Sequence, residues 1–265
     1  MARVFSLGRD QHDVPVDVVQ VLDNRARELS LPMVLIGAAA RDLCVHAPLG
    51  ERPPRATHDV DIAVAVPRGE ALAEFLSVFE RARRVHTVVI HGVEVDVVPF
   101  GGVERDGRVA FGDGSVLDVV GLAEAMRGPD VVALAEGVTV KVASIEMQAA
   151  LKVLAWRDRH VQNAKDAVDL HEILAAGSRG PYEEEAWGDL AALEACDYVL
   201  DLAGAYRLGA LSRRAFTAAR ARAVAGVLDD PVVFARLGTQ MSHLSSGELL
   251  DAYARGFRRG AHPLT

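Results

Sequence analysis

Two aspartates separated by one residue are the first side chains in this sequence that could do chemistry together. Asp59 and Asp61 lie in His58–Val66, whose alternation of polar and apolar residues predicts a β-strand. Strand side chains two positions apart point to the same face, so both carboxylates share one surface. A hard divalent cation with oxygen ligands would relieve their repulsion, although Asp-x-Asp also occurs on solvated strand edges.

A third carboxylate lies in the apolar run Val93–Val98. Glu94 and Asp96 fall on one side of this predicted strand, where a neighbouring strand could meet Asp59 and Asp61. A carboxylate in so apolar a strand is costly unless it is paired. Three acids at a sheet edge could hold two Mg²⁺ ions roughly 3.5–4 Å apart, which would activate a hydroxyl and neutralise a triphosphate. A solvated outer face is the alternative interpretation.

Donors for phosphate are found on either side of these strands. The apolar run Met33–Ile36 ends at Gly37, and a helix is expected to start at once, so the amides of Gly37 and Ala38 could face a phosphate. A plain chain reversal has the same pattern. Lys152 lies in the predicted helix Ser144–Arg157. It could deliver a point charge to the β- and γ-phosphates, or lay its stem along the core with its ammonium in water.

Short β-rich runs and helical stretches alternate in the first half of the chain and would position these side chains. We expect a helix over Gly69–Arg84, a loop over Gly101–Gly114, and strands at Met33–Ile36, His58–Val66, Val85–Ile90, Val93–Val98, Val131–Ala135 and Val138–Val142. The His91-Gly92 pair is short enough for a two-residue hairpin turn. From Ser144 onward the pattern is helical. The sequence therefore predicts an α+β protein, with a mixed-sheet domain over residues 1–142 and a mostly α-helical domain over residues 143–265.

Composition narrows the class of protein. The 265 residues include 29 Lys+Arg and 37 Asp+Glu, a net charge of −8, and half of them are hydrophobic, which excludes a disordered chain. The acidic balance argues against general coating of nucleic acid, so no DNA partner is expected. No apolar run approaches the roughly 20 residues of a membrane span, so no membrane partner is expected. The two distant cysteines and the lack of an export-type start favour a cytoplasmic protein.

Taken in order, these motifs resemble the nucleotidyltransferases of the DNA polymerase β superfamily, and within it the AbiEii family of nucleotidyltransferase toxins. The motifs are Ile36-Gly37-Ala38, Arg55–Asp61, Val95–Phe100, Leu151-Lys152 and Lys165–Leu170. The resemblance implies a polymerase-β-like core, a helical domain that completes the active site, and Mg²⁺-dependent use of a nucleoside triphosphate (NTP). Members act as toxins of toxin–antitoxin or phage-defence systems, some by adding nucleotides to tRNA. A cognate antitoxin is therefore an implied partner.

The resemblance also implies roles for single residues. Asp59, Asp61 and Asp96 would hold metal, and Asp96 would help to deprotonate the attacking hydroxyl. Gly37 and Ala38 would cradle phosphate through their amides. Most members have Gly or Ser after the glycine, so Ala38 removes a hydroxyl but keeps the backbone donor.

The remaining implied site positions contact the nucleotide or support the site. Lys152 would contact the triphosphate, and the resemblance implies that it is both a nucleotide-binding and a catalytic residue. Lys165 and Asp169 could equally be a helix-surface pair, because they are four residues apart. The full set of these positions is Arg55, Thr57, Lys152, Lys165, Asp166 and Asp169.

Three functions stay open at this point. Transfer of a nucleotide to tRNA is favoured by the resemblance, and Arg213, Arg214, Arg220 and Arg222 form either a basic face for it or an ordinary solvated surface. An aminoglycoside-type small-molecule nucleotidyltransferase would suit the negative charge of the chain. A non-catalytic nucleotide-binding regulator is the third, and the three-aspartate set argues against it.

Overall fold

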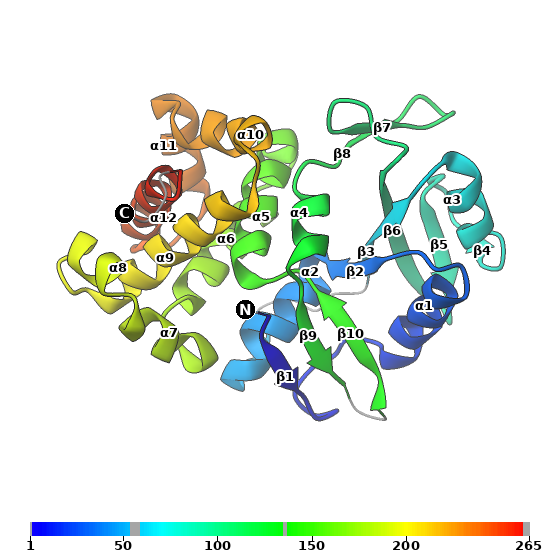
Figure 1. Cartoon of the computed structure of the whole chain (residues 1–265), viewed down its shortest axis with the longest axis horizontal. Coiled ribbons are helices and arrows are strands. Elements are labelled where there is room, and N and C mark those ends of the chain that lie inside the picture. The colour runs from blue at the N-terminus through cyan, green and yellow to red at the C-terminus, as the bar shows by residue number, and fades with distance from the viewer. Residues whose placement is uncertain (1, 54–58, 135–136, 262–265) are drawn as a thin grey trace. The chain divides into compact units, whose positions relative to one another are not determined.

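The structure is a computed structural model that describes residues 2–53, 59–134 and 137–261. The chain folds as two compact units, Met1–Ser144 and Ile145–Thr265 (Figure 1). The sequence places this boundary after residue 142. No helix in the described ranges is long and apolar enough to cross a membrane.

Among its described residues, the first unit contains an eight-stranded mixed sheet. Its strands lie in the order β1 (Val4–Ser6), β9 (Asp130–Ala133), β10 (Thr139–Val142), β2 (Met33–Ile36), β3 (Asp59–Val66), β6 (Val93–Gly101), β5 (Thr87–Ile90) and β4 (Glu80–Arg81). β3 lies between β2, with which it is antiparallel, and β6, with which it is parallel. The mixed sheet followed by a helical unit confirms the predicted α+β class.

Short helices and a small second sheet complete the first unit. These elements are α1 (Val16–Glu28), α2 (Gly37–Arg41), α3 (Gly69–Leu76), α4 (Leu122–Arg127), and the paired strands β7 (Arg108–Ala110) and β8 (Val116–Asp118). A π-helical turn, Asp42–His46, and a 3-10 turn, Ala47–Leu49, continue α2.

Two expectations for this unit are wrong. The helix predicted over Gly69–Arg84 ends at Leu76, because residues 80 and 81 pair with β5 as β4. Phe79, which extended the helical spacing, packs edge-on against Phe75 at 6.0 Å from outside the helix. Part of the loop predicted over Gly101–Gly114 is also the strand β7.

The central strands separate an apolar face from an acidic one. Val60 and Ile62 of β3 and Val95 and Val97 of β6 are at most 1% exposed. The alternate positions on the same strands carry the aspartates. This alternation buries one face of the sheet and leaves the other polar at the start of the two strands, before the buried Ala63 and Phe100.

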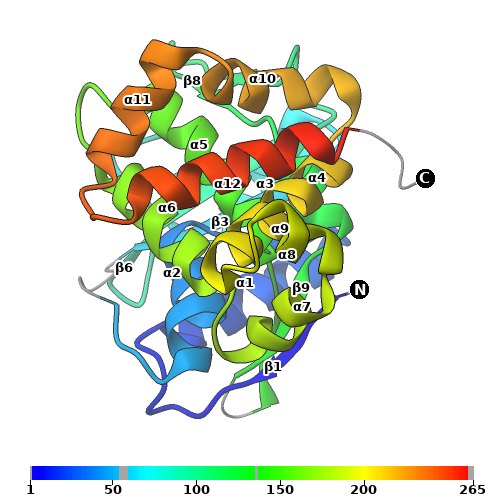
Figure 2. The same cartoon turned by 90° about the vertical axis from the view of Figure 1, so that its left-hand side faces the viewer.

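The second unit is entirely helical in its described residues. Its helices are α5 (Ile145–Arg159), α6 (Lys165–Ala176), α7 (Glu183–Gly188), α8 (Leu190–Ala195), α9 (Leu200–Ala215), α10 (Ala218–Leu228), α11 (Pro231–Gln240) and α12 (Ser246–Arg259), with a 3-10 turn at Gly180–Tyr182. α12 packs along α9 (Figure 2). Gly256 permits this close approach, because a Cβ there would lie 2.7 Å from the carbonyl carbon of Tyr206.

Candidate active site

Strand register brings the three predicted metal-binding aspartates to one face of the sheet. In the parallel pair of β3 and β6, Asp61 is opposite Asp96, and Asp59 is opposite Glu94. Register partners in neighbouring strands point to the same face. The expectation that the acids of the second strand meet those of the first is therefore confirmed.

The predicted phosphate turn lies directly against one of these carboxylates. Ile36, the last residue of β2, is opposite Asp61, and Gly37 starts α2 with a φ of +69°. A Cβ at Gly37 would lie 2.7 Å from Cγ of Asp61 and closer still to Oδ2. Only glycine combines this backbone conformation with this approach. The turn at Gly37 is therefore part of the acidic site, and Ala38 follows Gly37 in α2.

The carboxylate of Asp96 is paired, as its apolar strand requires. The hydroxyl of Thr87 in β5 donates to Oδ1 of Asp96, and Nη2 of Arg84 lies 3.1 Å from Oδ2. Thr87 is 1% exposed, whereas the side chain of Arg84 is 56% exposed. One partner is therefore fixed in the fold and the other reaches in from the surface.

Neither partner of Asp96 was among the predicted site residues. A signal for Thr87 was present in the hairpin, since a two-residue turn pairs Ile90 with Val93 and thereby places Thr87 opposite Asp96. No comparable signal exists for Arg84, which lies outside the strands and reaches Asp96 through its long side chain.

The donor set of this face suits Mg²⁺. Among the residues that the structure describes, no three His, Cys, Asp or Glu side chains already form a metal cage. Mg²⁺ usually takes only one or two carboxylates and completes its shell with water and substrate phosphates. Asp59 and Asp61, with a glycine turn against Asp61, offer that kind of partial site. Oxygen donors of this type fit Mg²⁺ better than a soft metal.

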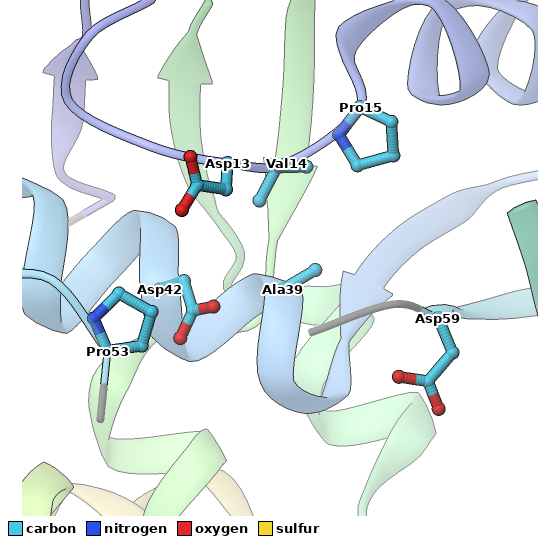
Figure 3. A pocket seen from close by; sticks show the side chains of 7 residues that line it. All are labelled: Asp13, Val14, Pro15, Ala39, Asp42, Pro53 and Asp59. Atoms are coloured by element: carbon cyan, nitrogen blue, oxygen red, sulfur yellow. The ribbon is translucent and has the colours of Figure 1, made fainter. Parts of the chain in front are cut away.

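Asp59 is exposed and lines a small pocket (Figure 3). The lining residues are Asp13, Val14, Pro15, Ala39, Asp42, Pro53 and Asp59. The carboxylate of Asp42 lies 2.8 Å from the fully buried guanidinium of Arg41. Asp59 is therefore open to solvent at the end of β3, as a ligand that must receive metal requires.

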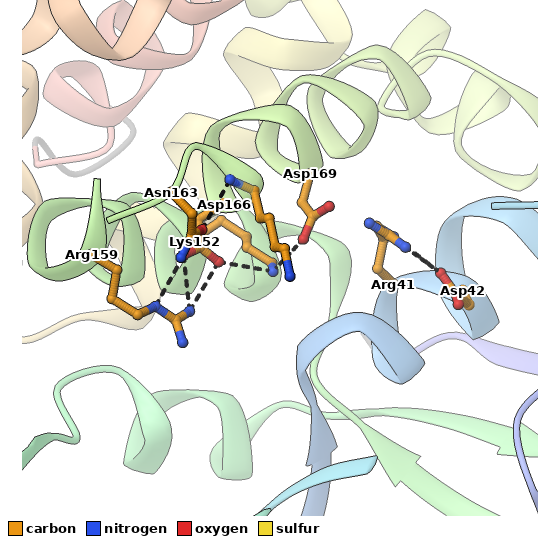
Figure 4. A network of polar contacts seen from close by, with 8 residues as sticks. Arg41, Asp42, Lys152, Arg159, Asn163, Asp166 and Asp169 are labelled. Atoms are coloured by element: carbon orange, nitrogen blue, oxygen red, sulfur yellow. Dashed lines mark hydrogen bonds and ion pairs between the residues drawn. The ribbon is translucent and has the colours of Figure 1, made fainter. Parts of the chain in front are cut away.

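The predicted site residues of the second unit form their own network (Figure 4). Nζ of Lys152 in α5 lies 2.6 Å from Asp169 and 3.1 Å from Asp166, both in α6. Arg159 adds a two-pronged contact to Asp166, through Nε at 3.1 Å and Nη2 at 3.0 Å. The carboxylates are 5% and 2% exposed and the lysine 13%, whereas the side chain of Arg159 is 55% exposed. Two acids are thus balanced by one buried base and by one that reaches in from the surface.

This network corrects two interpretations of the sequence. Lys152 does not keep its ammonium in water, because the ammonium donates hydrogen bonds to the carboxylates of Asp166 and Asp169. Asp169 contacts Lys152 rather than Lys165, which is exposed and whose amide donates to Asn163 at the start of α6. Arg55 and Thr57, which are also predicted site residues, lie outside the described residues.

The four arginines noted in the sequence lie on consecutive helices. Arg213 and Arg214 are in the last turn of α9, and Arg220 and Arg222 are in α10. Arg214 and Arg222 are exposed, whereas Nη1 of Arg213 donates to the carbonyl of Phe216 at 3.2 Å. Their use as a basic face for RNA stays a prediction.

Comparison with known proteins gives a family match over most of the chain. The profile of the nucleotidyl transferase AbiEii toxin family, of type IV toxin–antitoxin systems, matches residues 21–237. No curated protein matches the chain in sequence.

Two solved structures resemble the chain more distantly. One is a crystal structure of an antigenic nucleotidyltransferase-like protein from Paracoccidioides brasiliensis, with 20% identity over 71% of this chain and 91% of that one and a TM-score of 0.43. The other is a solution structure of the antibiotic-resistance factor ANT(2'')-Ia, with 16% identity over 69% and 96% and a TM-score of 0.36.

Proposed function

The chain belongs to the nucleotidyl transferase AbiEii toxin family of type IV toxin–antitoxin systems, and we propose that it transfers a nucleoside monophosphate from an NTP to a hydroxyl group of tRNA. The observation that carries this proposal is the register that sets Asp96 opposite Asp61, with Gly37 against Asp61. A module that only binds nucleotide has no need of a carboxylate poised to take a proton.

In this proposal the aspartates divide the work. Asp59 and Asp61 would hold Mg²⁺, with Asp96 as a further ligand. Two ions bound there would lower the pKa of the attacking hydroxyl and neutralise the triphosphate. Asp96 takes the proton of that hydroxyl. The hydroxyl oxygen then bonds to the α-phosphorus, the bond from that phosphorus to the bridging oxygen of the β-phosphate breaks, and pyrophosphate leaves.

The other predicted residues orient the nucleotide in this proposal. Gly37 and Ala38 present their amides to phosphate at the start of α2. Lys152 contacts the triphosphate, and Asp166 and Asp169 keep its ammonium in place. Lys165, Arg55 and Thr57 complete the set that the family resemblance implies.

The observations that support tRNA as the acceptor are less specific than those that support nucleotidyl transfer. The family resemblance supports tRNA, and the exposed arginines of α9 and α10 suit phosphate contacts. The net charge of −8 favours a cationic small molecule, such as an aminoglycoside, as the second candidate. A cognate antitoxin is proposed as the partner that controls the activity.

A labelling assay tests the acceptor. Purified protein is incubated with Mg²⁺ and each α-³²P-labelled NTP in turn, with total tRNA or a panel of aminoglycosides, and a reaction without Mg²⁺ is the control. Label in tRNA with one NTP supports the proposal and names the base. Label only in an aminoglycoside replaces tRNA with a small molecule, and no label in any acceptor contradicts both.

A further inference from the structure

We propose that Arg84 and Thr87 form a clamp on Asp96, in which Thr87 permanently aims the carboxylate and Arg84 occupies it until a divalent cation displaces the guanidinium. Both are positioning residues that act through Asp96. The inference deepens the proposed function and rests on Asp96 as a metal ligand.

Thr87 is the fixed half of the clamp. Its hydroxyl donates to Oδ1 of Asp96 from the neighbouring strand, and Thr87 is 1% exposed. The backbone around it is held on both sides, because the amide of Val97 donates to the carbonyl of His86 at 2.8 Å and the amide of Thr87 donates to the carbonyl of Arg84 at 3.1 Å. A carboxylate oxygen has two lone pairs, so Oδ1 can keep this bond and still ligate a metal.

Arg84 is the removable half. Its guanidinium meets Oδ2 of Asp96 at 3.1 Å, but 56% of its side chain is exposed, so it can return to water at little cost. The guanidinium neutralises Asp96 on the face that also carries Asp61. A divalent cation on that carboxylate would lie beside the positive charge of Arg84 and repel it. Arg84 and the metal therefore compete for one carboxylate.

This competition predicts the direction in which each substitution changes the affinity for the cation. Removing the charge of Arg84 strengthens cation binding, because the cation no longer displaces an ion pair. The ion pair is partly exposed, so the expected gain is small, about two- to fivefold in Kd. Removing the Thr87 hydroxyl weakens binding by about tenfold, as is common when a hydrogen bond that orients a metal ligand is lost.

The chain offers a matched control for the charge. Arg83 is the adjacent residue, is exposed, and has no contact with Asp96 among the described interactions. Arg83→Gln therefore makes the same change in net charge and the same change in long-range field without releasing the carboxylate. Arg84→Lys keeps the charge, and Thr87→Ser keeps the hydroxyl.

The test is an isothermal titration calorimetry experiment, in which Mn²⁺ alone is added to nucleotide-free, full-length protein and the Kd is measured. Wild type is compared with Arg84→Gln, Arg84→Lys, Arg83→Gln, Thr87→Val, Thr87→Ser and Asp96→Asn. Thermal unfolding of each variant without metal confirms that it is folded.

The clamp predicts tighter binding in Arg84→Gln, weaker binding in Thr87→Val and in Asp96→Asn, and wild-type binding in Arg84→Lys, Thr87→Ser and Arg83→Gln. Equal Kd values for Arg84→Gln and Arg83→Gln, while Asp96→Asn loses affinity, would overturn the clamp and leave Asp96 as a ligand. Unchanged affinity in Asp96→Asn would overturn both the clamp and the role of Asp96 in the proposed function. If Thr87→Val is unfolded, wild-type binding by a folded Thr87→Ala would overturn the Thr87 half.

Discussion

The carboxylate of Asp61 lies against the backbone of Gly37, so closely that a Cβ on the glycine would be 2.7 Å from Cγ of the aspartate. The two residues are far apart in sequence and meet because β2 pairs with β3. The contact couples the turn proposed to hold phosphate to a carboxylate proposed to hold metal. A side chain added at Gly37 should therefore displace the carboxylate of Asp61.

Gly37→Ala should abolish transfer. The added methyl must displace the Asp61 side chain, and the φ of +69° costs an alanine about 1–2 kcal/mol. Gly50→Ala is the control, because Gly50 has a φ of +66° with nothing within 4 Å of an added Cβ. Labelling rates and thermal unfolding are measured for both. Equal activity in the two variants would show that the contact with Asp61 is unimportant.

Lys152→Met should destabilise the protein by about 3 kcal/mol, apart from any effect on catalysis. The change removes the ammonium that lies 2.6 Å and 3.1 Å from two buried carboxylates, and breaking one side of a buried ion pair is costly. Urea unfolding measures the loss. Lys141→Met, on an exposed position of β10, should stay within about 0.5 kcal/mol of wild type. A stable Lys152→Met would argue against the network.

Acid should destabilise the second unit through a stacked histidine pair. Burial and the neighbouring His243, stacked with ring centroids 4.2 Å apart, lower the pKa of His171. A histidine with a lowered pKa in the fold binds its proton first in the unfolded chain. Its contribution to stability is therefore complete above about pH 6.5 and is lost as the pH falls through the interval down to the folded pKa.

His243→Phe keeps a stacked ring but removes the second imidazole. The pKa of His171 should rise toward its ordinary value, and the fall in unfolding free energy between pH 7 and pH 5 should become smaller. NMR titration of His171 and urea unfolding at both pH values measure these effects. An unchanged pKa of His171 would mean that His243 does not influence it.

Much of the carboxylate face could be predicted from sequence. The alternation in β3 and β6 shows which side chains share a face, and the two-residue turn after Ile90 sets the hairpin register. The contact between Gly37 and Asp61 could not be predicted, because it depends on which strand lies beside β3. That choice is made by packing of the whole sheet.

Residue spacing along the chain gave wrong predictions where a tertiary contact was stronger than the local one. Lys165 and Asp169 are one helical turn apart, but Asp169 binds Lys152 of the preceding helix, where burial makes the ion pair stronger. Phe79 continued the apolar spacing of α3 from beyond its end. Arg84 reaches Asp96 from a loop, and loop conformation leaves no periodic signal in the sequence.

The most direct test of the proposed chemistry is Mg²⁺-dependent nucleotidyl transfer by wild type and Asp61→Asn. The substitution keeps the shape of the side chain next to Gly37 but removes its charge, so the fold should survive and metal binding should not. Asp106→Asn, at an exposed turn position, is the control. We predict equal labelling by wild type and Asp106→Asn, and a loss of about a thousandfold in Asp61→Asn. Transfer by a folded Asp61→Asn at the wild-type rate would contradict the account.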